Sequence, residues 1–249
     1  MVSSLQSREE ESMSFARNVV LVAGGTGGLG RAVSLAFLNE GASVVVTYVV
    51  DQEFADLKTA ARGNESRLVG RKVDVTEEGA VEQLIKAILA DHGRLDVLVN
   101  TVGGYAGGMK LWEADTNILD HMLSMNLHSG FVLSRAAARI MLLQGRGSIV
   151  NVVARAALDH PAGLGAYAAS KAAALAMIDS LAADLKGTGV RANSILPSII
   201  DTPANRSAMP NADFATWPKP EDIAHVILFL ASDNAKVIHG AAIPVYGNA

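Results

Sequence analysis

Short, fully apolar runs alternate along the chain with longer segments in which apolar residues recur every three or four positions. An unbroken apolar run of four to eight residues is typical of a strand buried on both faces, and the wider spacing is typical of an amphipathic helix. The pattern predicts strands at 19–23, 43–50, 68–73, 95–99, 148–153, 190–196 and 242–246. It predicts helices at 31–39, 77–92, 118–143, 165–186 and 221–231. Such alternation indicates an α/β fold, a doubly wound parallel sheet with helices on both faces.

One domain accounts for the length of 249 residues, and no repeat or linker divides the chain. Residues 1–16 are polar and acidic, so we expect a disordered leader there and a single domain over 17–249. Five of the seven prolines lie in the segment 197–220, which has no helical or strand periodicity. This segment is longer than a usual connection, which predicts a functional or mobile loop.

The composition restricts the chemistry that the protein can carry out. A formal net charge of −4 argues against a nucleic-acid binder, because such proteins neutralise phosphates with clustered Lys and Arg. The absence of cysteine excludes disulfides, thiol nucleophiles and Cys-ligated metals, and the six scattered histidines favour no metal site. No membrane span or signal peptide is recognisable, so we expect a cytoplasmic protein with a small-molecule substrate. Its chemistry then depends on other side chains or on a bound cofactor.

A glycine-rich loop follows the first predicted strand directly and leads into a helix. Ligands of open α/β sheets bind beyond the carboxyl ends of the strands. Glycines let the backbone approach a pyrophosphate, and the helix that follows offers free N–H groups and the positive end of its dipole. This context distinguishes the loop from a plain turn and predicts Rossmann-type dinucleotide binding. The loop residues expected to contact the cofactor are Gly24, Thr26, Gly27, Gly28, Leu29 and Gly30.

The spacing Gly24-x3-Gly28-x-Gly30 resembles the glycine motif of the short-chain dehydrogenases/reductases. Further motifs follow in the order of that family, namely Asp74-Val75, Asn100-Thr101-Val102-Gly103, Tyr167-x3-Lys171 and the segment 197–202. The resemblance covers residues 18–247 and implies a homodimer or homotetramer that binds NADP or NAD. Beyond the glycine loop, it implies cofactor contacts by Tyr48, Asp74, Val75, Asn100, Val102, Gly103, Tyr167, Lys171, Pro197, Ile200 and Thr202.

Tyr167 and Lys171 are candidate catalytic residues. They are four positions apart, so they lie on one face of the predicted helix. A free tyrosine has a pKa of about 10, and a nearby ammonium is expected to lower that pKa and allow proton exchange. Taken alone, the pair would be interpreted as two solvated side chains on the surface of a helix. Because the glycine loop is also present, we interpret the pair as catalytic. The resemblance adds hydrogen bonds from Lys171 to the nicotinamide ribose.

The resemblance also matches Asn126 to an active-site Asn whose backbone holds a proton-relay water. By itself, a mid-helix Asn is interpreted as a polar residue that faces solvent.

The serine hydroxyl that the family uses to polarise a substrate carbonyl is missing, because Ala154 lies thirteen residues before Tyr167. Losing one such donor costs a few kcal/mol of transition-state stabilisation. The segments 103–108, 156–159 and 201–217 resemble the quinonoid dihydropteridine reductases, which also have alanine at this position. That resemblance implies a small planar substrate, a quinonoid dihydropterin or similar imine, which has no isolated ketone to polarise. It places Tyr105, Ala154 and Asn205 beside the substrate.

The choice of cofactor depends on the end of the second predicted strand. An acidic residue there binds the ribose 2′-hydroxyl and repels a 2′-phosphate. This chain has Tyr48 instead, which favours NADPH over NADH, with Arg31 and Arg71 as candidate phosphate partners. Two other functions remain open: a general carbonyl or alcohol oxidoreductase of the same family, and a catalytically silent dinucleotide-binding sensor or scaffold.

Overall fold

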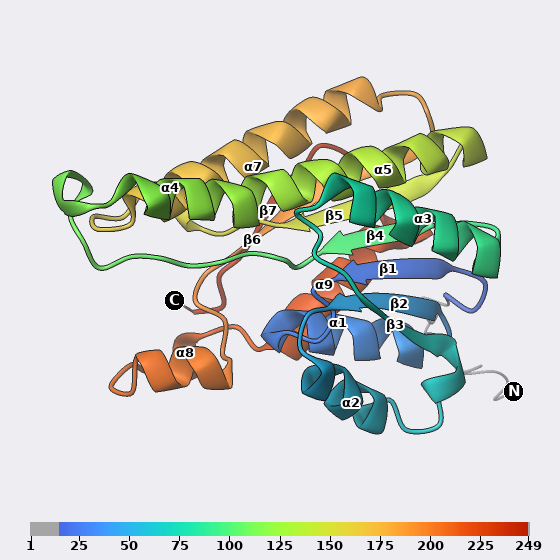
Figure 1. The fold of residues 1–249 in the computed structure, drawn as a ribbon, viewed down its shortest axis with the longest axis horizontal. Helices are drawn as coiled ribbons and strands as arrows, with labels where there is room; N and C mark the ends of the chain where they lie inside the picture. The colour runs from blue at the N-terminus through green and yellow to red at the C-terminus, as the bar shows by residue number, and fades with distance from the viewer. Residues whose placement is uncertain (1–14, 249) are drawn as a thin grey trace, which may run out of the picture.

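Seven parallel strands form one sheet in a computed structural model that describes residues 15–248 (Figure 1). The strands are β1 (Val19–Ala23), β2 (Ser43–Tyr48), β3 (Leu68–Lys72), β4 (Val97–Asn100), β5 (Gly147–Val152), β6 (Val190–Pro197) and β7 (Ala242–Val245). Their order is β3-β2-β1-β4-β5-β6-β7, so the direction of winding reverses between β1 and β4. Doubly wound sheets bind ligands at that reversal, beyond the carboxyl ends of the strands. The predicted fold class is confirmed.

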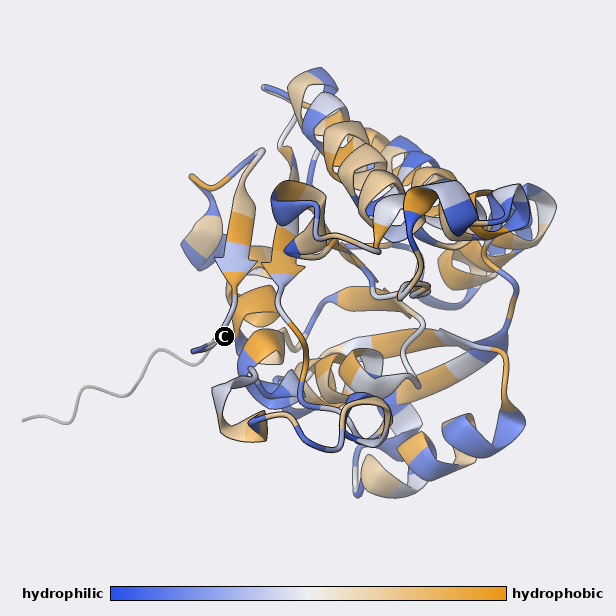
Figure 2. Cartoon of the chain, turned by 90° about the vertical axis from the view of Figure 1, so that its left-hand side faces the viewer, coloured by the Kyte–Doolittle hydropathy of each residue, from blue (hydrophilic) through white to orange (hydrophobic). Residues whose placement is uncertain are grey.

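Helices cover both faces of the sheet. They are α1 (Gly28–Asn39), α2 (Asp51–Ala60), α3 (Glu78–His92), α4 (Thr116–Leu123), α5 (Ser129–Gln144), α6 (Ala156–Asp159), α7 (Gly165–Asp184), α8 (Pro203–Ala208) and α9 (Pro220–Ala231). Successive side chains of a strand point to opposite faces. Val20 and Val22 therefore pack with α1 and α9, whereas Val19 and Leu21 pack with α3, α5 and α7. Figure 2 shows the strands mainly in the orange of hydrophobic residues and the blue of polar residues mainly on the outer helices and loops.

Two departures from the predicted elements concern helices of eight or more residues. The helix α2 was not predicted, because Leu57 is its only buried residue and most of its other positions are exposed and polar. The predicted helix 118–143 is in fact α4 and α5, joined by one turn of π-helix at Ser124–His128. π-Turns of this kind occur frequently at functional sites.

Two further corrections concern the amino-terminal residues and the segment 197–220. The predicted leader, residues 1–16, extends too far, because Phe15 is buried and packs edge-on against Phe37 with ring centroids 5.0 Å apart. Its first fourteen residues lie outside the described residues. The predicted loop 197–220 contains α8 and a 3-10 turn at Phe214–Thr216. Both α8 and the connection after β4 extend beyond the sheet on the same side, the left of Figure 1.

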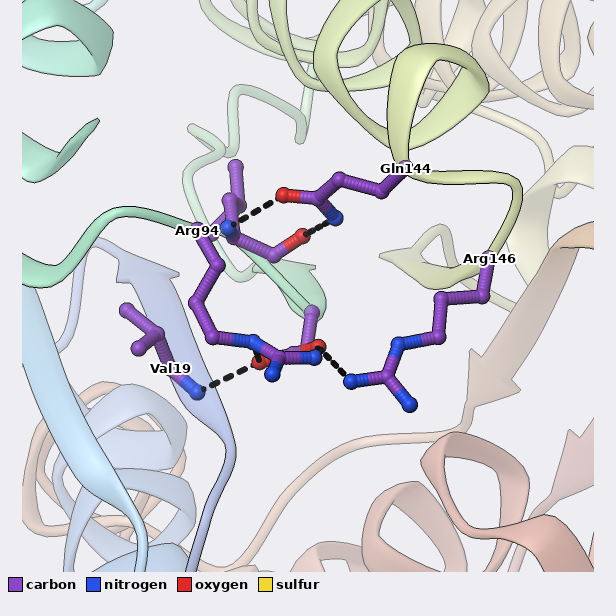
Figure 3. Close-up of polar contacts among 6 residues, drawn as sticks. Val19, Arg94, Gln144 and Arg146 are labelled. Atoms are coloured by element: carbon purple, nitrogen blue, oxygen red, sulfur yellow. Dashed lines mark hydrogen bonds and ion pairs between the residues drawn. The ribbon is translucent and has the colours of Figure 1, made fainter.

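A cluster of polar contacts joins the amino ends of the central strands (Figure 3). Asp96 is buried immediately before β4, and its carboxylate accepts hydrogen bonds from the Val19 backbone N–H at 2.9 Å and from Arg94 Nε at 2.7 Å. Arg146 approaches the same carboxylate to 3.8 Å, and the Gln144 amide bonds to the backbone of the residue before Asp96. This cluster ties β1, β4 and the end of α5 together at the edge of the sheet opposite the ligand edge.

Candidate active site

The glycine loop lies at the carboxyl end of β1 and is fixed there by β2. Thr47 accepts the Gly24 N–H on its hydroxyl oxygen at 2.9 Å and the Gly25 N–H on its carbonyl oxygen at 3.1 Å. Thr202 packs against the loop, since a Cβ on Gly28 would come within 2.9 Å of the Thr202 methyl carbon. Because Gly28 has no side chain, Thr202 can lie directly beside the glycine loop. The arrangement fits a pyrophosphate at the amino end of α1.

The residues predicted to surround the adenosine lie at the neighbouring strand ends. Tyr48 ends β2, and its ring stacks on Phe54 of α2 at 4.8 Å. Asp74 follows β3, and hydrogen bonds from the Thr76 hydroxyl and backbone lower the pKa of its carboxyl group. Val75 is buried beside it. These residues therefore share one edge of the sheet with the glycine loop.

The charges near this edge differ from the expectation drawn from the sequence. Arg71, a candidate phosphate partner, forms a 2.6 Å ion pair with Asp91. Arg31, the other candidate, is exposed on the first turn of α1. The Thr26 hydroxyl instead donates a 2.8 Å hydrogen bond to Glu53, a residue that the sequence analysis missed. Glu53 lies on α2, the helix whose weak apolar pattern also went unrecognised.

The segment after β4 packs directly against the candidate catalytic residues. The Asn100 side chain donates to Asn151 on β5 at 2.8 Å and accepts the Val102 N–H at 3.1 Å. A Cβ on Gly103 would lie 2.7 Å from Asn126 Oδ1 and 3.0 Å from Lys171 Nζ. Glycine is required at this close approach, which brings the end of β4, the π-turn and α7 to one point.

Asn126 is buried on the π-turn and joins two elements of the site. Its Oδ1 accepts the Gly104 N–H at 2.9 Å, and its Nδ2 donates to the Gly104 carbonyl at 3.0 Å and to Ser170 Oγ at 2.9 Å. The solvent-facing interpretation of this residue is wrong. The side chain positions the connection after β4 against α7, and the backbone role implied by the resemblance stays a prediction.

Burial sets the protonation of the pair on α7. Lys171 is almost fully buried and donates to the Val152 carbonyl at 3.2 Å, and desolvation lowers its pKa to about 8. Desolvation raises the pKa of Tyr167 to about 12, with a smaller contribution from Tyr105. The predicted lowering of the Tyr167 pKa by Lys171 is therefore wrong, because burial and Tyr105 both raise this pKa and Lys171 is not among the groups that shift it. Tyr167 therefore keeps its proton at neutral pH.

The predicted substrate residues are only partly brought together. Tyr105 is largely exposed, at 68%, and meets Tyr167 edge-on with ring centroids 5.1 Å apart. Ala154 is buried just beyond β5, where its carbonyl accepts the Ala157 N–H at the start of α6. Asn205 binds its own segment, since its amide donates to the Ile200 carbonyl at 2.8 Å and its N–H to the Thr202 hydroxyl at 3.2 Å.

Backbone hydrogen bonds also fix the end of β6 and the residues that follow it. The Pro197 carbonyl accepts the Arg155 N–H at 2.8 Å, and the Asp201 N–H donates to the Pro218 carbonyl at 2.9 Å. These bonds connect the segment after β6 to the residue beyond Ala154 and to the start of α9. Within residues 15–248, no group of three or more acidic or histidine side chains is placed to hold a metal ion. No helix in this range is long and apolar enough to cross a membrane.

Comparison with known proteins places these features in context. A family model described as short chain dehydrogenase matches residues 18–213. The chain is 30% identical over 239 residues to the 3-oxoacyl-[acyl-carrier-protein] reductase FabG of Thermotoga maritima, covering 92% of this chain and 96% of that protein. It is 34% identical over 255 residues to the meso-2,3-butanediol dehydrogenase of Serratia marcescens, covering 95% and 96%. The solved structure of ElxO with NADP bound matches with a TM-score of 0.88 and 25% identity, covering 93% of this chain and 98% of that one.

Proposed function

The chain belongs to the short-chain dehydrogenase family of NAD(P)-binding oxidoreductases, and we propose that it reduces the carbonyl group of a small molecule with Tyr167 as proton donor. The observation that carries this proposal is the placement of Tyr167 and the buried Lys171 one turn apart on α7, against the connection after β4. The pKa of Tyr167 is raised to about 12, so its phenol holds a proton that it can deliver to a developing alkoxide. The two relatives above are named for a 3-oxo compound and for a secondary diol, which are a ketone and an alcohol.

Other residues near the glycine loop would bind the cofactor. The backbone N–H groups of the glycine loop and the amino end of α1 would hold the pyrophosphate, beside Thr202. Asp74 and Val75 would contact the adenine, and Asn100, Val102 and Gly103 would contact the nicotinamide. When bound, the cofactor supplies the hydride.

Other residues of the site would donate the proton to the substrate and position the bound molecules. Tyr167 donates its phenolic proton to the substrate oxygen, and Lys171 holds the nicotinamide ribose from a buried position. Asn126 positions the connection that carries Tyr105. Tyr105 offers a flat ring at the mouth of the site, on which a planar or apolar part of a substrate can pack.

A second candidate substrate is a planar conjugated imine such as a quinonoid dihydropterin. Ala154 favours it, because the buried position after β5 offers no hydroxyl to polarise an isolated ketone. The two substrates differ in what a restored hydroxyl would do. Ala154→Ser is expected to raise turnover of a ketone and to leave turnover of the imine unchanged.

The test is oxidation of NADH or NADPH, followed by absorbance, with 3-oxo thioesters, diketones, simple ketones and a freshly generated quinonoid dihydropterin. Turnover of a ketone that is lost in Tyr167→Phe supports the proposal. Turnover of the pterin alone moves the assignment to the imine. Cofactor binding with no turnover on any substrate favours the third alternative, the silent sensor or scaffold.

We also propose that the protein is a homodimer or homotetramer. Phe131 and Leu142 are 46% and 45% exposed on the outer side of α5, and so offer apolar surface that a second copy can cover. Light scattering after size-exclusion chromatography measures the state directly, and a monomer at micromolar concentration contradicts it.

A further inference from the structure

The first turn of α2 brings carboxylates to the glycine loop. Asp51 and Glu53 lie in this turn, and Glu53 Oε2 accepts the Thr26 hydroxyl at 2.8 Å. In doubly wound folds the adenosine ribose lies between the glycine loop and the end of the second strand, where an acid contacts its 2′-hydroxyl. Position 48 has no acid, but Glu53 on α2 lies close to the glycine loop and so to the expected place of the ribose.

Two aromatic rings hold this turn in place. Tyr48 stacks on Phe54 with an interplanar angle of 6°. The Phe54 ring in turn lies over Gly70 of β3, where a Cβ would come within 2.3 Å of it. Because residue 54 is held against the sheet, residue 53 is directed toward the loop. The tyrosine that replaces the usual acid thus helps to position the acid that follows it.

Two cations of the neighbouring strand β3 are already paired. Lys72 forms a 2.6 Å ion pair with Asp51, and Arg71 forms one of the same length with Asp91. The positive end of the α2 dipole, which attracts anions, already carries two acidic residues in its first turn. A 2′-phosphate, with a charge of about −1.5 to −2 at neutral pH, would therefore meet the Glu53 carboxylate without a free cation from β3 to offset the repulsion.

We infer that Glu53 contacts the 2′ position of the adenosine ribose and makes the protein prefer NADH to NADPH. Thr26 occupies only part of the acceptor capacity of the carboxylate, so Glu53 can also accept the 2′-hydroxyl. Its charge repels a 2′-phosphate. The inference rests on the proposed cofactor function and reverses the NADPH preference that was expected from Tyr48. Arg31, exposed on the first turn of α1, is the competing residue that would favour NADPH.

The experiment measures cofactor binding without a substrate. Isothermal titration of the purified full-length protein with NADH and with NADPH gives both dissociation constants for the wild type, Glu53→Gln, Asp56→Asn and Arg31→Ala. Glutamine keeps an oxygen that can accept the Thr26 bond while removing the charge. Asp56→Asn is the matched control, because Asp56 is an exposed acid of the same helix that bonds to Gln52 rather than to the loop.

The wild type is expected to bind NADH about tenfold tighter than NADPH or more, and Glu53→Gln to reduce that ratio about tenfold, mainly by tightening NADPH. Asp56→Asn should leave the ratio within about twofold, because its charge is farther from the ribose. The inference is overturned if the wild type prefers NADPH and Arg31→Ala removes that preference, or if Glu53→Gln leaves the ratio unchanged. If neither cofactor binds the wild type, the proposed function itself fails, which is a separate result.

Discussion

Replacing Lys171 with methionine is expected to stabilise the protein at neutral pH while ending its catalysis. Lys171 is almost fully buried, and burial lowers its pKa from 10.5 to about 8. At about 1.4 kcal/mol per pKa unit, the folded state is penalised by about 3 kcal/mol whenever the lysine is protonated in both states. Loss of the bond from Nζ to the Val152 carbonyl offsets about 1 kcal/mol of this. The net gain at pH 7 is then about 2 kcal/mol, and methionine has a similar length and no charge to desolvate.

The pH dependence distinguishes this effect from ordinary repacking. Between pH 8 and 10.5 the unfolded chain binds the Lys171 proton and the folded protein does not, so wild-type stability rises with pH across this window. Below pH 8 both states are protonated and the penalty is complete. The advantage of Lys171→Met should therefore be largest at pH 7 and disappear as the pH approaches 10.5.

Urea unfolding measures this difference, with the buried Trp217 as fluorescent reporter and equal protein concentrations throughout. Lys186→Met is the matched control, because Lys186 is exposed just beyond the end of the same helix and should change stability little at any pH. A difference between Lys171→Met and wild type that stays constant from pH 7 to 10 would refute the reasoning. So would a variant that is less stable than the wild type at pH 7.

The remaining predictions concern the reaction and the scaffold. Tyr167→Phe should lower kcat by about 10²-fold or more, because the proton donor is lost, and should leave the dissociation constant of the reduced cofactor unchanged, as titration will show. Ala154→Ser should raise kcat/KM for a ketone about tenfold or more by returning one donor to the site; an unchanged value argues for the imine substrate. Asp96→Asn should lower the free energy of unfolding by about 2 kcal/mol, because the carboxylate that binds Val19 and Arg94 is buried, while cofactor affinity stays the same. Lost cofactor binding in Asp96→Asn would contradict its place at the far edge of the sheet.

Much of the fold could be predicted because its signals are local. Each central strand is an unbroken apolar run, and the glycine loop lies between β1 and α1 within a dozen residues. The positions of Tyr167 and Lys171 on one helix face follow from their spacing alone. Their pKa values could not be predicted, because spacing carries no information on burial, and burial decides both.

The contacts that could not be predicted join residues far apart in the sequence. Glu53 and Thr26 are 27 positions apart, and they meet only because the rings of Tyr48 and Phe54 hold the first turn of α2 against the sheet. The π-turn at Ser124–His128 shifts one residue of helical register inside a continuous apolar pattern, which periodicity does not resolve. The helix α2 itself was missed because it buries a single side chain.

The position of the Asp96 cluster affects which substitutions the protein can tolerate as it evolves. It lies at the amino ends of the strands, while the proposed substrate contacts lie beyond the carboxyl ends. Substitutions in the segment after β6 or around Tyr105 can therefore alter the range of substrates without disturbing the contacts of the Asp96 cluster. For directed evolution, a library confined to residues 104–113 and 198–219 should retain a high fraction of folded members. In a library spread evenly over the chain, many members would carry destabilising substitutions at positions such as Asp96.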